Sequence, residues 1–253
     1  MDFDSTITEE STLMQLYLRL PKKIFERTIE ISNIDYYKYE EPLTRKCYSN
    51  LVLTIRRSKS WEECLKQITA IVLRYSRDIE GIELKGMNLI EDCLKNLNIR
   101  GITRAASQIK IRPGFSSFIK GFDKDSRYIL SFNWSNQLIG MICSNIPSSN
   151  IISNSLNFKD DRCLGFNSRA IILTPDHKFN HFNRLKDRLN VFCGDSLPDL
   201  LPCLYSNLAF AFVSHDKEFL SICNMLREKF SRLIYIVNNF NDANRVLNRV
   251  SLV

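Results

Sequence analysis

The segment Asp2-Phe3-Asp4-Ser5-Thr6-Ile7-Thr8 decides how the rest of this sequence is interpreted. It places two carboxylates two residues apart and follows them with hydroxyl side chains. Alternate side chains of an extended chain point the same way, so Asp2 and Asp4 can approach one ligand if the chain bends after them. A solvated acidic terminus is the simpler explanation of this pair alone. The segment therefore acquires a chemical meaning only together with residues further along the chain.

The bulk composition sets limits on the class of protein. The chain has 253 residues, of which 44% are apolar, which suits one large domain or a domain with a substantial insertion. No apolar run approaches the roughly 18 residues that a membrane span needs. The chain also does not open with the charged-then-apolar pattern of a signal peptide. The net charge of +7 comes from basic residues scattered among acids, so we expect no nucleic-acid partner and no membrane partner.

The cysteines point to the redox compartment. They stand at positions 47, 64, 93, 143, 163, 193, 203 and 223. They form no C-x-x-C pair and the chain has only three histidines, which argues against a zinc site. Many lie in apolar stretches, as buried free thiols do. We therefore predict a reducing, cytoplasmic location, while the sequence leaves the oligomeric state open between monomer and dimer.

Residues 9–110 have the pattern of a helical bundle. Apolar residues recur at helical spacing in the segments 10–20, 42–57, 61–72 and 86–97. Pro21 ends the first segment, and Ser60 with Glu63 three residues later forms a capping box before the third. We predict four helices that share a small core of their own.

The pattern changes after Arg112 to short alternating strands and helices. We predict helices at 116–121, 136–143, 175–189 and 217–230, and strands at 128–130, 191–193, 208–212 and 233–237. A hairpin is predicted from strands 150–158 and 169–173 around the polar turn 159–165. Such alternation predicts an α/β fold with a Rossmann-like, mostly parallel sheet, in which ligands bind outside the carboxyl ends of the strands.

Four polar residues join the N-terminal carboxylates in this arrangement. Ser131 follows a predicted strand, Lys178 opens a predicted helix, and Asp195 and Asp199 follow another strand. Each alone has a structural explanation, as a strand-end hydroxyl, a surface lysine, or the N-cap and first-turn acid of a helix. Together with Asp2 and Asp4 they supply what phosphoryl transfer needs: a nucleophile, an acid, a cation and hydrogen-bond donors.

The chemistry of each residue type suggests its role. Asp2 is the predicted nucleophile, which forms an aspartyl-phosphate, and Asp4 is the general acid and base. Mg²⁺ prefers a few carboxylates plus water and substrate oxygens. We expect it to be held by Asp2, the Asp4 backbone carbonyl and Asp195, with Asp199 orienting the site. The hydroxyl of Ser131 and the ammonium of Lys178 would hold the phosphoryl oxygens.

The motifs DFDST, ILSFNWS, TPDHK and GDSLPD resemble those of the haloacid-dehalogenase (HAD) superfamily, which are D-x-D-x-T, a strand-end Ser or Thr, a Lys, and G-D-x-x-x-D. The resemblance covers almost the whole chain. WEECLKQI, LKGMNLIEDCLK and GDSLPDLLPCL look most like a helical-cap phosphatase branch. That branch includes the hydrolase half of thiaminase-II-fused thiamine monophosphate phosphatases and a fungal cold-tolerance protein.

The resemblance implies a HAD-like catalytic core at 1–8 and 111–253, with a helical cap inserted at 9–110. It also implies a Mg²⁺-dependent hydrolase acting on a small phosphorylated metabolite. The phosphate-binding positions expected in these motifs are Thr6, Ser131, Asn133 and Lys178. Trp134, just past the second motif, is placed either to stack on a flat substrate or simply to pack at a strand end.

Two features depart from the family pattern. Phosphoserine phosphatases usually carry an acid nine residues after the nucleophile, where this chain has Ser11, so we disfavour phosphoserine. The family also has an apolar strand before the first aspartate, in the middle of the sheet, whereas Met1 alone precedes Asp2. Without that strand, buried backbone groups would lack partners at about 1–3 kcal/mol each. We therefore expect either missing upstream residues or a poorly stable, largely inactive protein. The alternative function is thus a catalytically impaired relative with a binding or regulatory role.

Overall fold

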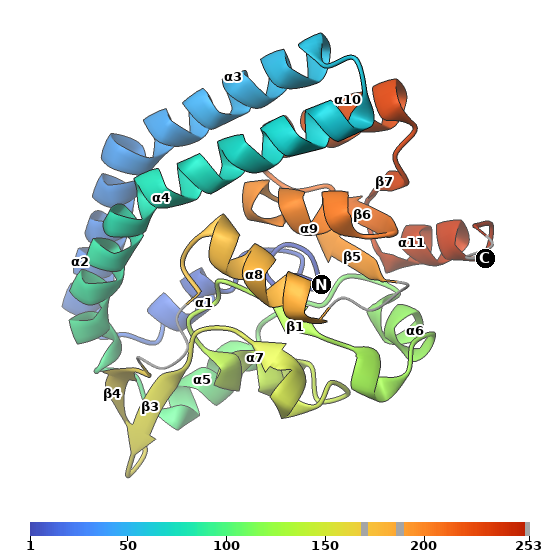
Figure 1. The fold of residues 1–253 in the computed structure, drawn as a ribbon. Coiled ribbons are helices and arrows are strands. Elements are labelled where there is room, and N and C mark those ends of the chain that lie inside the picture. Colours follow the sequence, from blue (N-terminus) through green and yellow to red (C-terminus); the bar gives the residue numbers. More distant parts are fainter. Residues whose placement is uncertain (168–171, 186–189, 251–253) are drawn as a thin grey trace.

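The computed structural model describes residues 1–167, 172–185 and 190–250, without the side chains of residues 34–37. Its first part is helical, as predicted for residues 9–110 (Figure 1). The helices are α1 (Leu13–Tyr17), α2 (Lys22–Asp35), the π-helix η1 (Tyr36–Glu40), α3 (Glu41–Arg57), α4 (Trp61–Leu94) and α5 (Ile99–Ala106). α3 and α4 form a long pair along one side of the molecule (Figure 1).

The helix boundaries differ from the prediction in instructive ways. α4 is one helix of 34 residues where two were predicted, and it runs straight through Gly86. A glycine inside a helix costs about 1 kcal/mol, and the buried side chains of Ile79, Met87 and Ile90 continue the apolar stripe across it. The predicted cap is present, since the Ser60 hydroxyl accepts a hydrogen bond from the Glu63 backbone N–H at 3.2 Å. α2 was not predicted.

The prediction of a separate core for the helical segment is wrong. Buried side chains of α3 and α4 belong to the same apolar cluster as those of α8 (Pro175–Leu185), α9 (Leu200–Tyr205) and α10 (Lys217–Phe230). Side chains of α1, α5 and the end of α4 cluster instead with α7 (Asn136–Ile142) and with the hairpin of β3 (Leu156–Lys159) and β4 (Arg162–Phe166). A helical pattern fixes which face is apolar but not what that face packs against.

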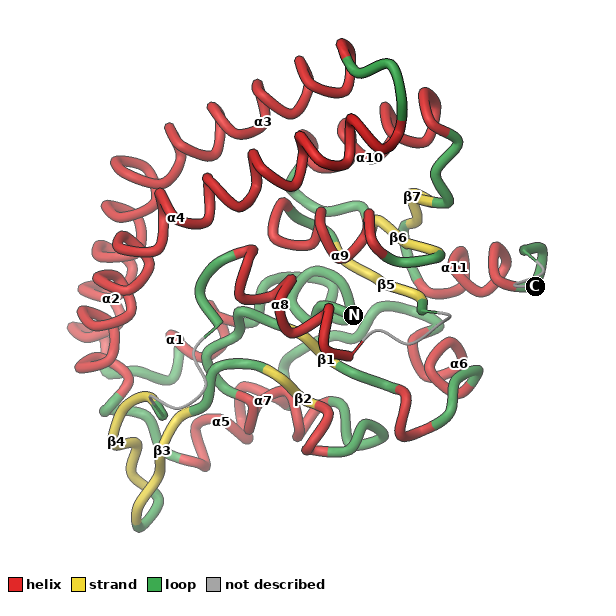
Figure 2. The backbone as a smooth tube through the Cα atoms, viewed as in Figure 1, coloured by secondary structure: helices red, strands yellow, loops and turns green. Residues whose placement is uncertain are grey.

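The second part alternates strands and short helices, as predicted (Figure 2). Its strands are β1 (Ile129–Leu130), β2 (Ile151–Ile152), β3 (Leu156–Lys159), β4 (Arg162–Phe166), β5 (Val191–Gly194), β6 (Leu208–Phe212) and β7 (Ile234–Val237). Its α-helices are α6 (Phe115–Lys120), α7 (Asn136–Ile142), α8 (Pro175–Leu185), α9 (Leu200–Tyr205), α10 (Lys217–Phe230) and α11 (Phe240–Leu247). β1 pairs in parallel with β2, and β5, β6 and β7 form a second parallel sheet in that order.

The hairpin lies elsewhere than predicted. β3 and β4 pair in antiparallel fashion around a tight turn at Asp160 and Asp161, both in the left-handed region with φ of 48° and 70°. Aspartate tolerates this conformation better than most residues, and two-residue hairpin turns require it. The predicted first strand is divided, because Ile151–Ile152 pairs with β1 instead. Residues 169–171 of the predicted second strand lie outside the described residues.

The first two residues connect the two parallel sheets. The Leu130 N–H donates to the Met1 carbonyl at 2.9 Å, and the Asp2 N–H donates to the Cys193 carbonyl at 2.8 Å. The Met1 ammonium donates to the Tyr128 carbonyl at 2.9 Å. Residues 1–2 therefore lie between the edges of β1 and β5, with the N-terminus well inside the molecule (Figure 1). This arrangement delivers Asp2 to the carboxyl ends of both strands.

The state of the cysteines and the character of the helices were also predicted from the sequence. All eight cysteines are buried and none is in a disulfide, as expected for free thiols. Across the described ranges, no helix combines the length and apolar character required to cross a membrane.

Candidate active site

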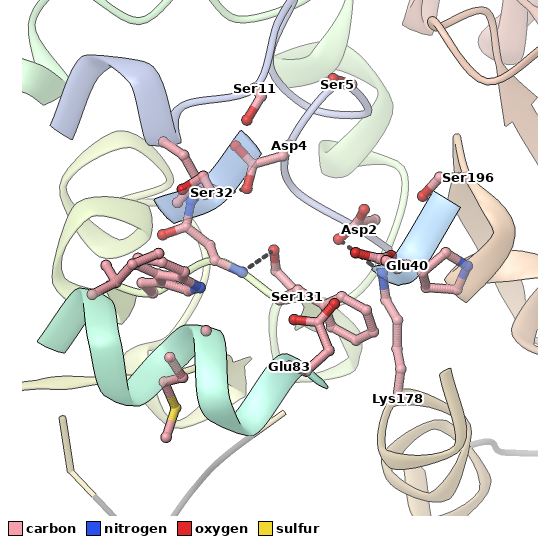
Figure 3. A pocket seen from close by; sticks show the side chains of 18 of the residues that line it. Asp2, Asp4, Ser5, Ser11, Ser32, Glu40, Glu83, Ser131, Lys178 and Ser196 are labelled. Atoms are coloured by element: carbon pink, nitrogen blue, oxygen red, sulfur yellow. Dashed lines mark hydrogen bonds and ion pairs between the residues drawn. The ribbon is translucent and has the colours of Figure 1, made fainter. Parts of the chain in front are cut away.

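The predicted catalytic residues meet at one cavity. It has a volume of about 380 Å³, and its lining includes Asp2, Asp4, Ser131, Lys178 and Asp195 (Figure 3). Ser131 follows β1 and Asp195 follows β5, so the cavity lies where parallel α/β sheets bind their ligands, outside the carboxyl ends of the strands. Asn133 also lines it.

Lys178 is the central cation of this site. Its side chain comes from the first turn of α8 and is 1% exposed. Its ammonium lies 3.0 Å from Asp2 Oδ1 and 2.6 Å from Asp199 Oδ1. Burial alone would lower the pKa of Lys178, but Asp199 and Asp2 outweigh burial and raise that pKa, so the ammonium stays charged. The surface-lysine explanation of the sequence motif is therefore wrong.

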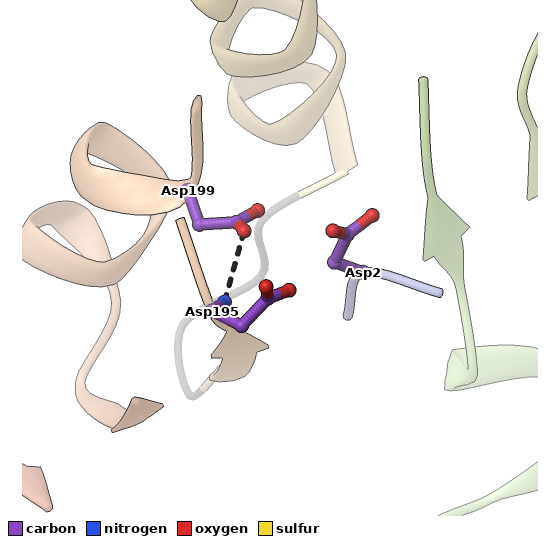
Figure 4. Close-up of side chains that lie close together, drawn as sticks. All are labelled: Asp2, Asp195 and Asp199. Atoms are coloured by element: carbon purple, nitrogen blue, oxygen red, sulfur yellow. Dashed lines mark hydrogen bonds between the residues drawn. The ribbon is translucent and has the colours of Figure 1, made fainter. Parts of the chain in front are cut away.

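Three buried carboxylates gather beside this ammonium. Asp2, Asp195 and Asp199 each place one oxygen within 4.8 Å of the others (Figure 4). Burial raises the pKa of Asp2 to about 7, with Lys178 opposing and Asp199 adding to the shift. Burial, together with Asp2 and Asp199, raises the pKa of Asp195 well above its usual value. Oxygen ligands and excess negative charge are what Mg²⁺ selects, so these residues fit the predicted ion.

The loop after β5 is built to present two of these carboxylates. Asp199 Oδ2 accepts hydrogen bonds from the backbone N–H groups of Asp195 at 3.1 Å and Ser196 at 3.3 Å. The loop folds back so tightly that a Cβ on Gly194 would lie 2.4 Å from the Asp199 Cβ and Cγ atoms. Glycine is required there because of this close approach. Asp199 thus has one oxygen bound to backbone and the other paired with Lys178, and its orienting role at a metal site stays a prediction.

Asp4 lies apart from the carboxylate cluster. Its Oδ1 accepts hydrogen bonds from the Thr12 N–H at 2.6 Å and the Thr12 hydroxyl at 2.7 Å. Its Oδ2 accepts from the Asn133 amide at 2.9 Å. The Asp4 carboxylate is thus held in the cavity wall and does not join the three clustered carboxylates. The metal-binding role of its backbone carbonyl stays a prediction.

The two other predicted phosphate ligands are engaged with protein groups. The Thr6 hydroxyl donates to Asp195 Oδ1 at 2.7 Å and therefore orients that carboxylate. The Asn133 amide donates to Thr12 Oγ1 at 2.7 Å as well as to Asp4. Contact of either side chain with phosphate stays a prediction. Ser131 is buried, and its Oγ accepts from the Asn133 N–H at 3.1 Å.

Several supporting residues escaped the sequence reasoning. Asp216 caps α10 by accepting from the Phe219 N–H at 2.9 Å, and it also accepts from the Leu197 N–H and the Tyr48 hydroxyl. An aspartate just before a predicted helix signals the cap, but its link to Tyr48 depends on how α3 packs. Arg112 donates to the backbone carbonyls of Ser5, Thr8, Val213 and Asn238, fixing the N-terminal loop to the strand ends.

Comparison with solved structures places the fold. A substrate-bound phosphoserine phosphatase matches with a TM-score of 0.56 at 15% identity, covering 99% of this chain and 96% of that one. A phospho-aspartyl intermediate analogue of phosphoserine phosphatase matches with a TM-score of 0.54 at 16% identity and the same coverage. The chain has the fold of HAD-like phosphatases. Cytosolic 5'-nucleotidase IIIB bound to cytidine also matches this HAD-like fold, with a TM-score of 0.54 at 14% identity, covering 97% of this chain and 82% of that one.

Sequence comparisons add no closer assignment. No protein-family model matches the chain, and no curated protein matches its sequence. At identities of 14–16% the structural likeness establishes the HAD-like fold alone. The thiamine monophosphate phosphatase branch stays a prediction.

The raised carboxylate pKa values predict how stability depends on pH and Mg²⁺. Folded Asp2 keeps its proton up to about pH 7, whereas an unfolded aspartate releases it near about 3.9. The folded state therefore binds more protons between these values, and the contribution of Asp2 to stability falls as pH rises through this window. The pKa of Asp195 is raised as well, so its contribution to stability changes with pH in the same direction. Because Mg²⁺ competes with protons, it should raise the melting temperature more at about pH 7.5 than at about pH 5.

Scanning fluorimetry with and without MgCl₂ at the two pH values measures this difference. Asp195→Asn, which removes one carboxylate of the cluster, should lose most of the Mg²⁺-dependent rise. The same rise at both pH values would contradict metal binding by these protonatable carboxylates.

Proposed function

We propose that the protein is a Mg²⁺-dependent phosphomonoester hydrolase that acts on a small phosphorylated metabolite through an aspartyl-phosphate. The observation that carries this proposal is the buried group around Lys178, in which one ammonium pairs with Asp2 and Asp199 beside Asp195. A purely structural role would not require three buried carboxylates around one lysine at a cavity, because each uncompensated charge is costly to bury. Perturbed ionisable groups in a cleft are typical of catalytic sites.

The proposed reaction has two steps. The Asp2 carboxylate attacks phosphorus, so that an Asp2–phosphorus bond forms while the ester P–O bond breaks, and Asp4 gives its proton to the leaving oxygen. Asp4 then takes a proton from water as the water attacks the phosphoryl group and releases Asp2. The hydrogen bonds from Thr12 and Asn133 hold the Asp4 carboxyl at the cavity wall for both transfers.

The remaining site residues are proposed to bind Mg²⁺ or the phosphoryl oxygens. We assign Mg²⁺ to Asp2, the Asp4 backbone carbonyl and Asp195, with Asp199 as the orienting carboxylate. When bound, the ion neutralises phosphoryl charge and holds the phosphate oxygens in place. The Lys178 ammonium is positioned within ion-pair distance of the Asp2 carboxylate, and the Ser131 hydroxyl lines the same cavity. Both are therefore proposed to bind phosphoryl oxygens.

We further propose the division into a core at 1–8 and 111–253 and a cap at 9–110. The two crossing points support it, because Thr8 and Ile111 form an isolated antiparallel bridge and the Glu9 N–H donates to the Lys110 carbonyl at 3.0 Å. An inserted segment whose ends lie side by side leaves the parent fold intact. Closure of such a cap would exclude water from the cleft. A cytoplasmic location remains part of the same proposal.

Hydrolysis of p-nitrophenyl phosphate with and without MgCl₂ tests the function. We expect activity that requires Mg²⁺, and a higher Mg²⁺ requirement in Asp195→Asn, because that variant removes one of the clustered carboxylates. Asp123→Asn is the matched control, since Asp123 is exposed and lies outside the cavity lining. Failure of the purified, folded protein to hydrolyse the ester would favour the alternative of a catalytically impaired binding protein.

A further inference from the structure

A tyrosine of the helical segment is hydrogen-bonded to the short segment 214–216, which supports the loop 195–199. Tyr48 lies on α3 and is buried, and its hydroxyl donates to Asp216 Oδ2 at the N-terminus of α10. α3 and α10 are neighbours in the fold and share one apolar cluster (Figure 1). Burial and Asp216 raise the pKa of Tyr48, so the phenol keeps the proton that it donates. None of the roles assigned above uses this hydrogen bond.

The two oxygens of Asp216 have different partners. Oδ1 accepts a hydrogen bond from the Phe219 N–H at 2.9 Å, which is the capping bond of α10. Oδ2 accepts both from the Tyr48 hydroxyl and from the Leu197 N–H, the latter at 3.2 Å. Because capping a helix requires only one side-chain oxygen, the second oxygen is available to join α3 to the loop 195–199.

The same short segment holds the loop at a second point. The Ser214 hydroxyl donates to the Asp195 carbonyl at 2.8 Å, and the Asp216 N–H donates to the Ser214 hydroxyl at 3.2 Å. Leu197 lies between Asp195 and Asp199 in the sequence. The direction of both carboxylates therefore depends on a stretch of backbone that is fixed at these two points.

The loop 195–199 must hold its carboxylates close to a third one before any ion binds. Asp2, Asp195 and Asp199 place oxygens within 4.8 Å of one another, and ionised carboxylates at such distances repel. A loop that was free to relax would move two of them away from the third and lose affinity for a cation. Residues that orient metal ligands from outside typically account for about 10–100-fold of a site's affinity.

Resting on the Mg²⁺ site of the proposed function, we propose that Tyr48 is a positioning residue for metal binding. Through Asp216 it fixes the loop 195–199, so that the packing of α3 contributes to the affinity of the carboxylate cluster for Mg²⁺. Tyr48 lies outside the cavity lining and acts by orienting Asp216. The helical segment thereby supports the metal site in addition to lining the cavity.

Calorimetric titration of the full chain with MgCl₂ measures this contribution without any substrate, at about pH 7.5, where protons compete less for the carboxylates. Tyr48→Phe retains the buried ring and removes the donated hydrogen bond. We expect it to raise the Kd for Mg²⁺ about tenfold. The Mg²⁺-dependent rise in melting temperature should become smaller in the same variant. An unchanged Kd in Tyr48→Phe overturns the proposal.

Thr69→Val is the matched control. The Thr69 hydroxyl on α4 shares a hydrogen bond of 3.1 Å with the Tyr205 hydroxyl on α9, so this variant also removes a hydroxyl bond between the helical segment and the second part of the fold. That bond involves neither the loop 195–199 nor the segment 214–216, and Thr69→Val should keep the wild-type Kd. A similar rise of Kd in both variants would mean that general loosening weakens the site, which overturns the role of Tyr48.

A double-variant cycle tests whether Tyr48 acts through Asp216. Asparagine is a good N-cap residue, so Asp216→Asn should keep its oxygen on the Phe219 N–H and turn its amide, which cannot accept a hydrogen bond, toward Leu197. Once that link is lost, adding Tyr48→Phe should weaken Mg²⁺ binding no further. Independent, multiplying effects of the two substitutions would show that Tyr48 does not act through Asp216, and would overturn the proposal.

The outcomes separate this proposal from the phosphatase function. Mg²⁺ binding that depends on Tyr48, without hydrolysis of p-nitrophenyl phosphate, supports the positioning role and overturns the function. Hydrolysis that requires Mg²⁺, with the same Kd in wild type and Tyr48→Phe, overturns the positioning role and leaves the function standing. Absence of Mg²⁺ binding in the wild type overturns the metal assignment, and the positioning role with it.

Discussion

Asp2→Asn abolishes turnover, and Asp4→Asn accumulates a phosphorylated protein; these are the largest effects on activity that we expect. An amide is not a nucleophile toward phosphorus, so Asp2→Asn removes the first step. Loss of a covalent nucleophile costs on the order of 10⁴-fold or more in turnover. Asp4→Asn retains the nucleophile but lacks the group that takes a proton from water, so a substrate with a good leaving group should still phosphorylate Asp2.

Intact-protein mass spectrometry after mixing with p-nitrophenyl phosphate and Mg²⁺ distinguishes the two variants. The phosphoryl adduct should accumulate in Asp4→Asn and be absent from Asp2→Asn. Structural damage is a poor explanation for this contrast, because an asparagine oxygen at position 2 can still accept a hydrogen bond from Lys178, which lies 3.0 Å away. Melting curves of both variants check this point. Normal steady-state turnover in Asp2→Asn would remove the covalent mechanism.

The sequence predicted best those features that depend on strand ends. Parallel strands bring their carboxyl ends to one edge, so Ser131 and Asp195 were expected together, and they line one cavity. Lys178 was expected to point into the same crevice, and its side chain lines that cavity. These predictions needed only the position of each residue relative to a strand or helix.

Features that depend on packing between distant segments were not predictable in the same way. Thr12 holds Asp4, and Tyr48 reaches Asp216, only because the helical segment packs as it does against the strands. The prediction of two helices that divide near Gly86 was wrong. α4 continues through this glycine because buried side chains on both sides of it form one stripe. The two residues of the hairpin turn, Asp160 and Asp161, are of a type that favours such turns. They lie within the longer polar segment 159–165, so the sequence pattern did not single them out.

A short apolar strand added in front of Met1 should raise the melting temperature clearly. β1 and β5 pair with β2 and β6 on one side only, and their other edges meet Met1 and Asp2, which supply one backbone hydrogen bond to each. Beside Met1 lies a second cavity of about 390 Å³, whose lining includes the apolar side chains of Phe118, Leu130 and Phe192. The space between the two edges therefore has the character of a strand position.

The free-energy terms favour such an extension. Each apolar side chain buried in the cavity contributes about 1.5–3 kcal/mol, against about 1–2 kcal/mol for ordering each added residue. Backbone hydrogen bonds to the facing edges add about 1 kcal/mol each. Burial lowers the pKa of the Met1 amine, which means that its charged form is unfavourable there. The extension replaces this amine with an uncharged peptide bond.

We expect an extension with the sequence Val-Ile-Val-Ile, after a new initiator methionine, to gain about 2 kcal/mol, which corresponds to roughly 4–8 °C for a chain of this size. An extension of the same length made of Gly-Ser-Gly-Ser is the control, because it lengthens the chain without apolar side chains to bury. Since Met1 alone separates Asp2 from this segment, a fixed strand should also hold the nucleophile more firmly beside Lys178. Mg²⁺-dependent hydrolysis should therefore rise in the apolar extension only. Equal melting temperatures for the two extensions would mean that the edges of β1 and β5 do not accept a strand between them.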